Sequence, residues 1–271
     1  MTSEMVETSL DDTTNAAADA IEDAVRKSTL GIVVGSGKQK WTGIGTGTLV
    51  RWRGQLLILT ADHVLGTTAL DDLRFFLPNE TPPATIDREA LLRLKGLPAA
   101  GLRPFRDLHV STIQRDATLD LAAINLSESD VSNISAVAFD MLDEDREATP
   151  GLTSLVIGFP HDISRILQDD SRVVFTQIDW SPVEVARPDF PGFDPAVHFL
   201  TQYTPPQWAS DANPRGLSGA ARWARRGSTP GVWFPNLDVI GVTVTYYPVN
   251  RLLKMVRRSV VNRFLRECIT A

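Results

Sequence analysis

The sequence predicts an all-β protein with one helix near each end. Short apolar segments of strand length recur along most of the 271 residues, and turn-forming residues separate them. Helical spacing of apolar residues is confined to the two ends of the chain. Hydrophobic residues make up 43% and charged residues 22%, as in ordinary globular proteins. The length allows one large domain or two modest ones, and the strand pattern suits barrels or sandwiches.

The predicted strands fall into two groups on either side of an acidic loop at residues 140–147. Those of the first group are 30–34, 45–52, 55–60, 73–77, 108–115 and 120–126. Those of the second group are 153–159, 172–178, 197–203, 219–224 and 237–247. The two residues Arg53 and Gly54 predict a hairpin between neighbouring strands. Stretches rich in Pro and Asp at 78–88 and 186–195 predict surface loops.

Both predicted helices are amphipathic. The first spans about 12–27, with Ala20, Ile21 and Val25 on its apolar side and basic residues at its end. The second is predicted from an apolar stripe formed by Val249, Leu252, Leu253, Val256, Val260, Phe264 and Cys268. We expect each helix to pack on the outside of a barrel. A membrane or partner contact through the basic face of the second helix is the alternative.

Charge and composition argue against several classes of protein. The formal net charge is −6, and residues 1–25 contain acidic residues but no Lys or Arg. Nucleic-acid binding is therefore not expected. No apolar run reaches the length of a membrane span, and the acidic start does not resemble a secretory signal. Because Cys268 is the only cysteine, no intrachain disulfide is expected, and we predict a cytoplasmic location.

Three segments carry residues that suit nucleophilic catalysis. LLILTADHVL (56–65) ends an apolar strand at His63, ATLDLAAINL (117–126) places Asp120 before one, and NPRGLSGAA (213–221) sets Ser218 between glycines. Each residue alone is explained by a loop or a turn. Together they supply a hydroxyl nucleophile, an imidazole base and a carboxylate that orients the base.

The order His-Asp-Ser separates the known serine-hydrolase arrangements. An α/β-hydrolase needs a histidine after the serine, but the last histidine is His198. A subtilisin-like order needs the aspartate first, and no Asp before His63 sits at a convincing strand end. Asp107 and Asp116 are alternatives for the carboxylate. Asp120 is preferred because the run LAAINL that follows it is typical of a core strand.

Other residue patterns do not predict a cofactor site. His109, His161 and His198 are scattered and lack the spacing of zinc ligands. Gly43, Gly45 and Gly47 do not match a dinucleotide-binding loop, because the third glycine is misplaced and no helix follows. We therefore expect neither a metal nor an organic cofactor.

The three segments resemble those of trypsin-like (chymotrypsin-fold) serine peptidases, particularly bacterial members. TADHV is similar to the family's histidine segment, DLAAI to its aspartate segment and RGLSGAA to its serine segment; GTGTLV (45–50) and VIGFP (156–160) also resemble bacterial members. The resemblance spans about residues 30–268. It implies two antiparallel six-stranded β-barrels, with 1–28 as an acidic extension, 29–145 as the first barrel unit, and 146–271 as the second barrel with a C-terminal helix.

The resemblance also implies roles for individual residues. Ser218 would be the nucleophile, His63 the general base and then acid, and Asp120 the orienting carboxylate. The N–H groups of Gly216 and Ser218 would form the oxyanion hole. The strand around Thr243, Val244 and Thr245 would pair with an extended polypeptide substrate. The implied activity is that of a serine endopeptidase working through an acyl-enzyme.

The sequence departs from the family pattern near the expected site. Leu217 stands where many members have Asp or Asn, and Ala220 replaces a usual glycine. Tyr246 falls on the expected wall of the substrate pocket, where several members have glycine. Asp211 lies near the position of a pocket-floor acid, but one residue out of register. These departures leave two alternatives: an inactive fold that serves as a protein-binding module, or an enzyme activated by a regulatory protein partner.

Overall fold

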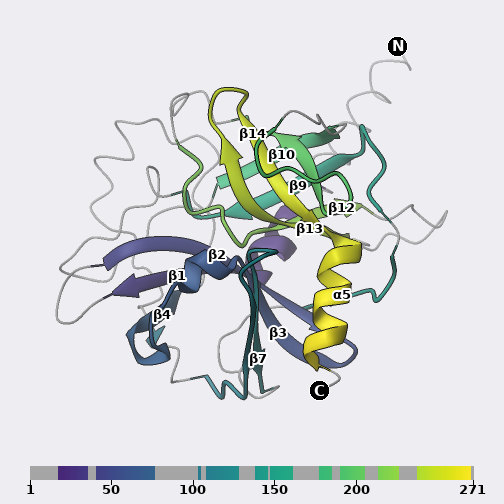
Figure 1. The fold of residues 1–271 in the computed structure, drawn as a ribbon. Helices are drawn as coiled ribbons and strands as arrows, with labels where there is room; N and C mark the ends of the chain where they lie inside the picture. Colours follow the sequence, from purple (N-terminus) through teal and green to yellow (C-terminus); the bar gives the residue numbers. More distant parts are fainter. Residues whose placement is uncertain are drawn as a thin grey trace, which may run out of the picture.

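The computed structural model divides the strands of the chain between an N-terminal sheet and a C-terminal barrel (Figure 1). It describes residues 18–35, 41–76, 103–104, 108–127, 138–145, 147–160, 177–184, 190–204, 213–225 and 237–269. Within these ranges, no helix is both long and apolar enough to cross a membrane. The predicted loop at 78–88 and Asp211 lie outside the described residues.

The N-terminal sheet has eight strands. They are β1 (Thr29–Gly35), β2 (Trp41–Trp52), β3 (Gln55–Thr60), β4 (Leu73–Phe76), β5 (Arg103–Pro104), β6 (Ile113–Asp116), β7 (Leu121–Leu126) and β8 (Phe139–Met141). Their order is β5-β4-β1-β2-β3-β7-β6, and β8 runs parallel to β2. The predicted hairpin at Arg53 and Gly54 joins β2 to β3. The expected six strands thus become eight over the described residues, because the short strands β5 and β8 join the sheet.

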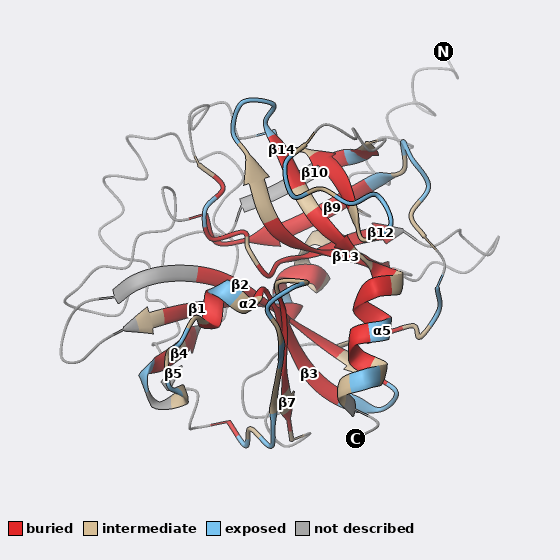
Figure 2. Ribbon diagram, in the orientation of Figure 1, coloured by how far each residue is buried: buried red, intermediate tan, exposed pale blue. Residues whose placement is uncertain are grey.

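The C-terminal strands form a closed six-stranded antiparallel barrel, as predicted. They are β9 (Thr153–Gly158), β10 (Gln177–Glu184), β11 (His198–Gln202), β12 (Ala221–Arg225), β13 (Leu237–Tyr247) and β14 (Leu252–Arg257). The barrel closes in the order β10-β11-β14-β13-β12-β9. Strands β3, β7, β9 and β13 are largely buried, which matches their apolar sequences (Figure 2).

The N-terminal helix covers residues 18–28 of the described chain, and Ile21 and Val25 are buried as the stripe predicts. The C-terminal prediction is wrong in its first half. Residues 252–257 form strand β14, and the helix α5 spans only Arg258–Ile269. Because β14 pairs with both β11 and β13, it closes the barrel and its apolar residues are buried there. A short apolar run is compatible with both helical and strand spacing, so pairing with neighbouring strands decides its structure.

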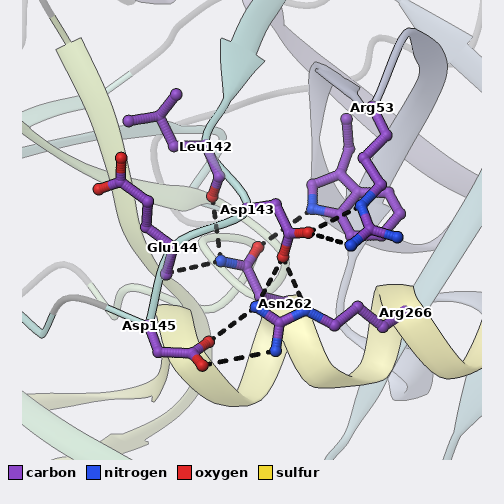
Figure 3. A network of polar contacts seen from close by, with 8 residues as sticks. Arg53, Leu142, Asp143, Glu144, Asp145, Asn262 and Arg266 are labelled. Atoms are coloured by element: carbon purple, nitrogen blue, oxygen red, sulfur yellow. Dashed lines mark hydrogen bonds and ion pairs between the residues drawn. The ribbon is translucent and has the colours of Figure 1, made fainter.

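Polar contacts fix helix α5 to the segment that links the two halves (Figure 3). The Asn262 side chain donates to the carbonyls of Leu142 and Glu144 and accepts from the Trp52 indole. Arg266 pairs with Asp143 and Asp145, and Arg53 in the β2–β3 turn also pairs with Asp143. Helix α5 therefore connects the β2–β3 hairpin of the N-terminal sheet to residues 142–145, which lead into the C-terminal barrel.

We predict that Asn262→Ala lowers the free energy of unfolding by about 1–3 kcal/mol, because Asn262 is fully buried and its loss leaves the Trp52 N–H and two carbonyls without partners. Urea unfolding monitored by circular dichroism measures the change. Arg263→Ala, an exposed position on the same helix, is the matched control and is expected to change stability little. Equal stability of the two variants would contradict this account of the network.

Candidate active site

The turn that carries Ser218 is docked onto strands of the N-terminal sheet through buried Thr46. The Thr46 N–H donates to the Ser218 carbonyl at 2.8 Å, and the Thr46 hydroxyl donates to the Gly216 carbonyl at 2.5 Å. The Thr60 hydroxyl donates to the Thr46 carbonyl at 2.8 Å. Contacts between the two halves of the molecule therefore set the position of the candidate nucleophile.

Gly219 allows this close approach. Its φ is 88°, and a Cβ there would lie 2.0 Å from the Thr46 carbonyl oxygen and 2.9 Å from the Ala61 backbone nitrogen. No side chain fits in that space, so glycine is required. The docking places the Ser218 turn beside Ala61, two residues before His63.

His63 and Asp120 meet at the end of the N-terminal sheet. Strand β3 ends at Thr60, and the short helix α2 (Asp62–Leu65) presents His63 immediately after it. The His63 Nδ1 lies 2.7 Å from Asp120 Oδ2, and the His63 backbone N–H donates to Asp120 Oδ1 at 2.9 Å. One carboxylate thus holds both the ring and the backbone of His63.

Asp120 is held in an unusual backbone conformation. It ends the turn between β6 and β7 with a φ of 56°, which L residues adopt only at a cost. Its carbonyl accepts from the Asp62 N–H at 3.1 Å, in addition to the two bonds that its carboxylate makes with His63. Asp116, one alternative for the carboxylate, instead caps the same turn at the N–H groups of Thr118 and Leu119. Asp107, the other alternative, lies outside the described residues.

The hydrogen bond that the His63 ring donates to the Asp120 carboxylate raises the pKa of His63 above its ordinary value. Partial burial opposes this rise, while the negative charges of Asp120 and Asp62 add to it. With Nδ1 bonded to a carboxylate, the proton of the neutral ring sits on Nδ1, and Nε2 is left as the basic nitrogen. This is the tautomer that can take a proton from a hydroxyl.

The turn around Ser218 holds the two N–H groups that are expected to form an oxyanion hole. The Leu217 N–H donates to Pro214, Gly219 to Thr243 and Ala220 to Leu217. Within the described chain, the N–H groups of Gly216 and Ser218 have no protein acceptor. Gly216 has a φ of 100°, which glycine adopts without strain.

Leu217 anchors the Ser218 turn through an apolar side chain. Its side chain is 1% exposed and belongs to the buried cluster of the C-terminal barrel that includes Val156 and Phe199. Burial of this side chain fixes the turn without an ion pair. The sequence departure at this position is therefore compatible with an ordered Ser218 turn.

A pocket of about 300 Å³ opens beside Ser218. It is lined by Asn213, Pro214, Arg215, Ser218, Thr243, Val244, Thr245, Tyr246, Pro248 and Leu253. The predicted substrate-binding residues 243–246 therefore line the same pocket as Ser218. Tyr246 forms part of the wall and meets Tyr203 edge-to-face with ring centroids 5.5 Å apart.

Of the other histidines considered as ligands, His198 takes part in a local hydrogen bond. The Asp194 N–H donates to His198 Nδ1, and burial lowers the pKa of His198 to about 4. His161 lies outside the described residues. Among the residues that the structure describes, no three His, Cys, Asp or Glu side chains gather as metal ligands would.

Sequence reasoning missed two residues that shape the site. Thr46 joins the halves, and Arg115 on β6 bonds Asp62 beside His63. Thr46 lies within GTGTLV, a segment marked as similar to bacterial peptidases, but its bond to Gly216 spans 170 residues. No local pattern reveals such a partner.

Solved structures of serine proteases share this architecture. The active form of the Rv3671c protease from M. tuberculosis aligns with a TM-score of 0.53 at 12% identity, covering 92% of this chain and 84% of that chain. The serine endoprotease from Yersinia pestis aligns with a TM-score of 0.56 at 11% identity, covering 93% of this chain and 66% of that chain. No protein-family model and no curated protein sequence matches the chain.

At these identities the similarity establishes architecture alone. The alignments cover more than nine-tenths of this chain and therefore include both the N-terminal sheet and the closed barrel. The chain therefore has the trypsin-like, chymotrypsin-type fold of serine proteases.

Proposed function

We propose that the protein is a serine endopeptidase that hydrolyses peptide bonds through a Ser218–His63–Asp120 triad. The observation that carries this proposal is the pairing of His63 with Asp120 at 2.7 Å, next to a Ser218 turn docked against Thr46 and Ala61. The trypsin-like fold supports the same conclusion.

Each residue has a defined step in the proposed reaction. The Ser218 hydroxyl attacks the scissile carbonyl while His63 Nε2 takes its proton. The Gly216 and Ser218 N–H groups donate to the resulting oxyanion, and Asp120 stabilises the imidazolium. His63 then gives its proton to the leaving amine, which leaves an acyl-enzyme. A water molecule, deprotonated by His63, hydrolyses that ester and restores Ser218.

The edge of β13 favours an extended polypeptide substrate. Strand β12 pairs with β13 only up to Val242, and Thr243 bonds to Gly219 and Ala220. Beyond Thr243, the strand pairs only with β14 among the described residues. The other edge of residues 244–246 borders the pocket and offers backbone groups to a peptide strand.

We predict that a fluorophosphonate probe labels the wild-type protein, and that Ser218→Ala and His63→Ala each reduce the labelling rate by at least about 10³-fold. Mass spectrometry of the intact protein measures the labelling. Unfolding curves verify that each variant is folded, and Ser259→Ala on α5 is the serine control expected to label normally.

Two results would contradict a constitutively active peptidase. Folded wild-type protein that never labels would favour the protein-binding module. Weak labelling that rises on addition of a partner protein would favour partner activation. Labelling that persists in Ser218→Ala would show that another residue is the nucleophile.

The pH dependence of labelling provides a further prediction. His63 must be neutral to accept a proton, and its pKa is raised by Asp120. The rate should therefore increase with pH through a midpoint above 6.5 and be lost below it. Stopped-flow or discontinuous labelling across pH 4–9 measures the profile. His198→Gln should leave the midpoint unchanged, and a midpoint below 6.5 would contradict a His63 pKa raised by Asp120.

A further inference from the structure

An ion pair lies directly beside the His63–Asp120 pair. Arg115 on strand β6 places its Nε 2.5 Å from Asp62 Oδ1, and its Nη2 donates to the Asp62 carbonyl at 3.3 Å. The Asp62 side chain is 14% exposed and the Arg115 side chain 39% exposed. The planar guanidinium thus donates hydrogen bonds to both the side chain and the backbone of Asp62, the residue before His63.

The short helix α2, which carries His63, depends on outside contacts. It has four residues, and Ala61 at its start provides no side-chain cap. A helix of this length does not hold itself together in water. Support comes from the burial of Val64 and Leu65 and from hydrogen bonds with the β6–β7 hairpin: two from Arg115 to Asp62, and the others between Asp120 and residues 62 and 63.

The hairpin turn also depends on α2. Asp120 keeps its φ of 56° while its carbonyl and both carboxylate oxygens bond to α2. A left-handed Asp persists only where surrounding contacts over-determine it. Relative movement of α2 and the hairpin would therefore displace His63 and Asp120 from each other and break their hydrogen bonds.

We propose that Arg115 is a positioning residue that, through Asp62, holds helix α2 against the β6–β7 hairpin and keeps the His63 ring aligned with the Asp120 carboxylate. Its kinetic consequence rests on the peptidase function proposed above, whereas its effect on His63 itself does not. An exposed ion pair alone contributes little. Here the pair joins the two elements that carry the imidazole and its carboxylate.

The charges around His63 make the two possible roles of Arg115 distinguishable. The ring faces Asp120 from the β6–β7 turn and Asp62 from its own helix, Arg115 pairs with Asp62 from β6, and Lys254 on β14 interacts with Asp120. Loss of a nearby positive charge alone would raise the pKa of His63. Loss of alignment would lower it, because the Asp120 hydrogen bond is the main reason it is raised. The sign of the change separates positioning from charge.

The test is an NMR titration of the His63 imidazole in the full chain, with His63→Gln to assign its signals. We expect Arg115→Met to lower the His63 pKa toward its ordinary value of about 6.5. Arg115→Lys keeps the charge but lacks the planar group that donates to both the carboxylate and the carbonyl of Asp62. We therefore expect a smaller decrease in the His63 pKa. Arg53→Met, which breaks an Arg–Asp pair at the opposite end of β3, is the matched control and should leave the His63 pKa unchanged.

An unchanged or raised His63 pKa in folded Arg115→Met would overturn the proposal. If that variant does not fold, Arg115→Lys decides: a lower His63 pKa supports positioning, and an unchanged one refutes it. Because the titration needs no turnover, it remains decisive even if the wild-type protein fails to label with a fluorophosphonate.

Kinetics add a second readout if the wild-type protein is active. Arg115→Met should lower the fluorophosphonate labelling rate about tenfold, as expected for a displaced base. For a peptide substrate, the same loss should fall on kcat with little change in KM, because Arg115 does not line the pocket. The positioning role would be refuted if Arg115→Met changed only KM. It would also be refuted if the variant kept both the labelling rate and the His63 pKa of the wild-type protein.

Discussion

The candidate site depends on one close contact between the two halves of the molecule. The backbone of Gly219 packs directly on the Thr46 carbonyl, and Thr46 in turn bonds to the carbonyls of Ser218 and Gly216. Because the turn belongs to the barrel and Thr46 to the N-terminal sheet, the site forms only when the halves are packed together. Helix α5 contributes a further connection through its contacts with residues 142–145 and with the β2–β3 hairpin (Figure 3).

The other half of the site is assembled from two short elements that support each other. Helix α2 presents His63, and the β6–β7 turn presents Asp120 in a backbone conformation that costs energy. Hydrogen bonds between them offset that cost and set the basicity of the ring at the same time. Structure and electrostatics are therefore coupled: any movement that misaligns the pair also changes the charge state of the proposed base.

Local sequence patterns predicted most of the strands because turn residues bound them clearly, as at Arg53 and Gly54. They failed at 252–257, where an apolar run with helical spacing became β14 because β11 and β13 lie on either side of it. The candidate residues His63, Asp120 and Ser218 could be found from their flanking segments. Thr46 and Arg115 could not, because their roles come from partners 170 and 53 residues away in the sequence.

In the proposed reaction, Ser218, His63 and the N–H groups of Gly216 and Ser218 must all converge on one carbonyl group of the substrate. A crystal structure of the protein after reaction with a fluorophosphonate tests this most directly. We expect the phosphorus on Ser218 Oγ, one phosphonyl oxygen within hydrogen-bond distance of both N–H groups, and His63 Nε2 facing the adduct. Phosphorus bound to another residue, or a His63 ring turned away from a modified Ser218, would contradict the account.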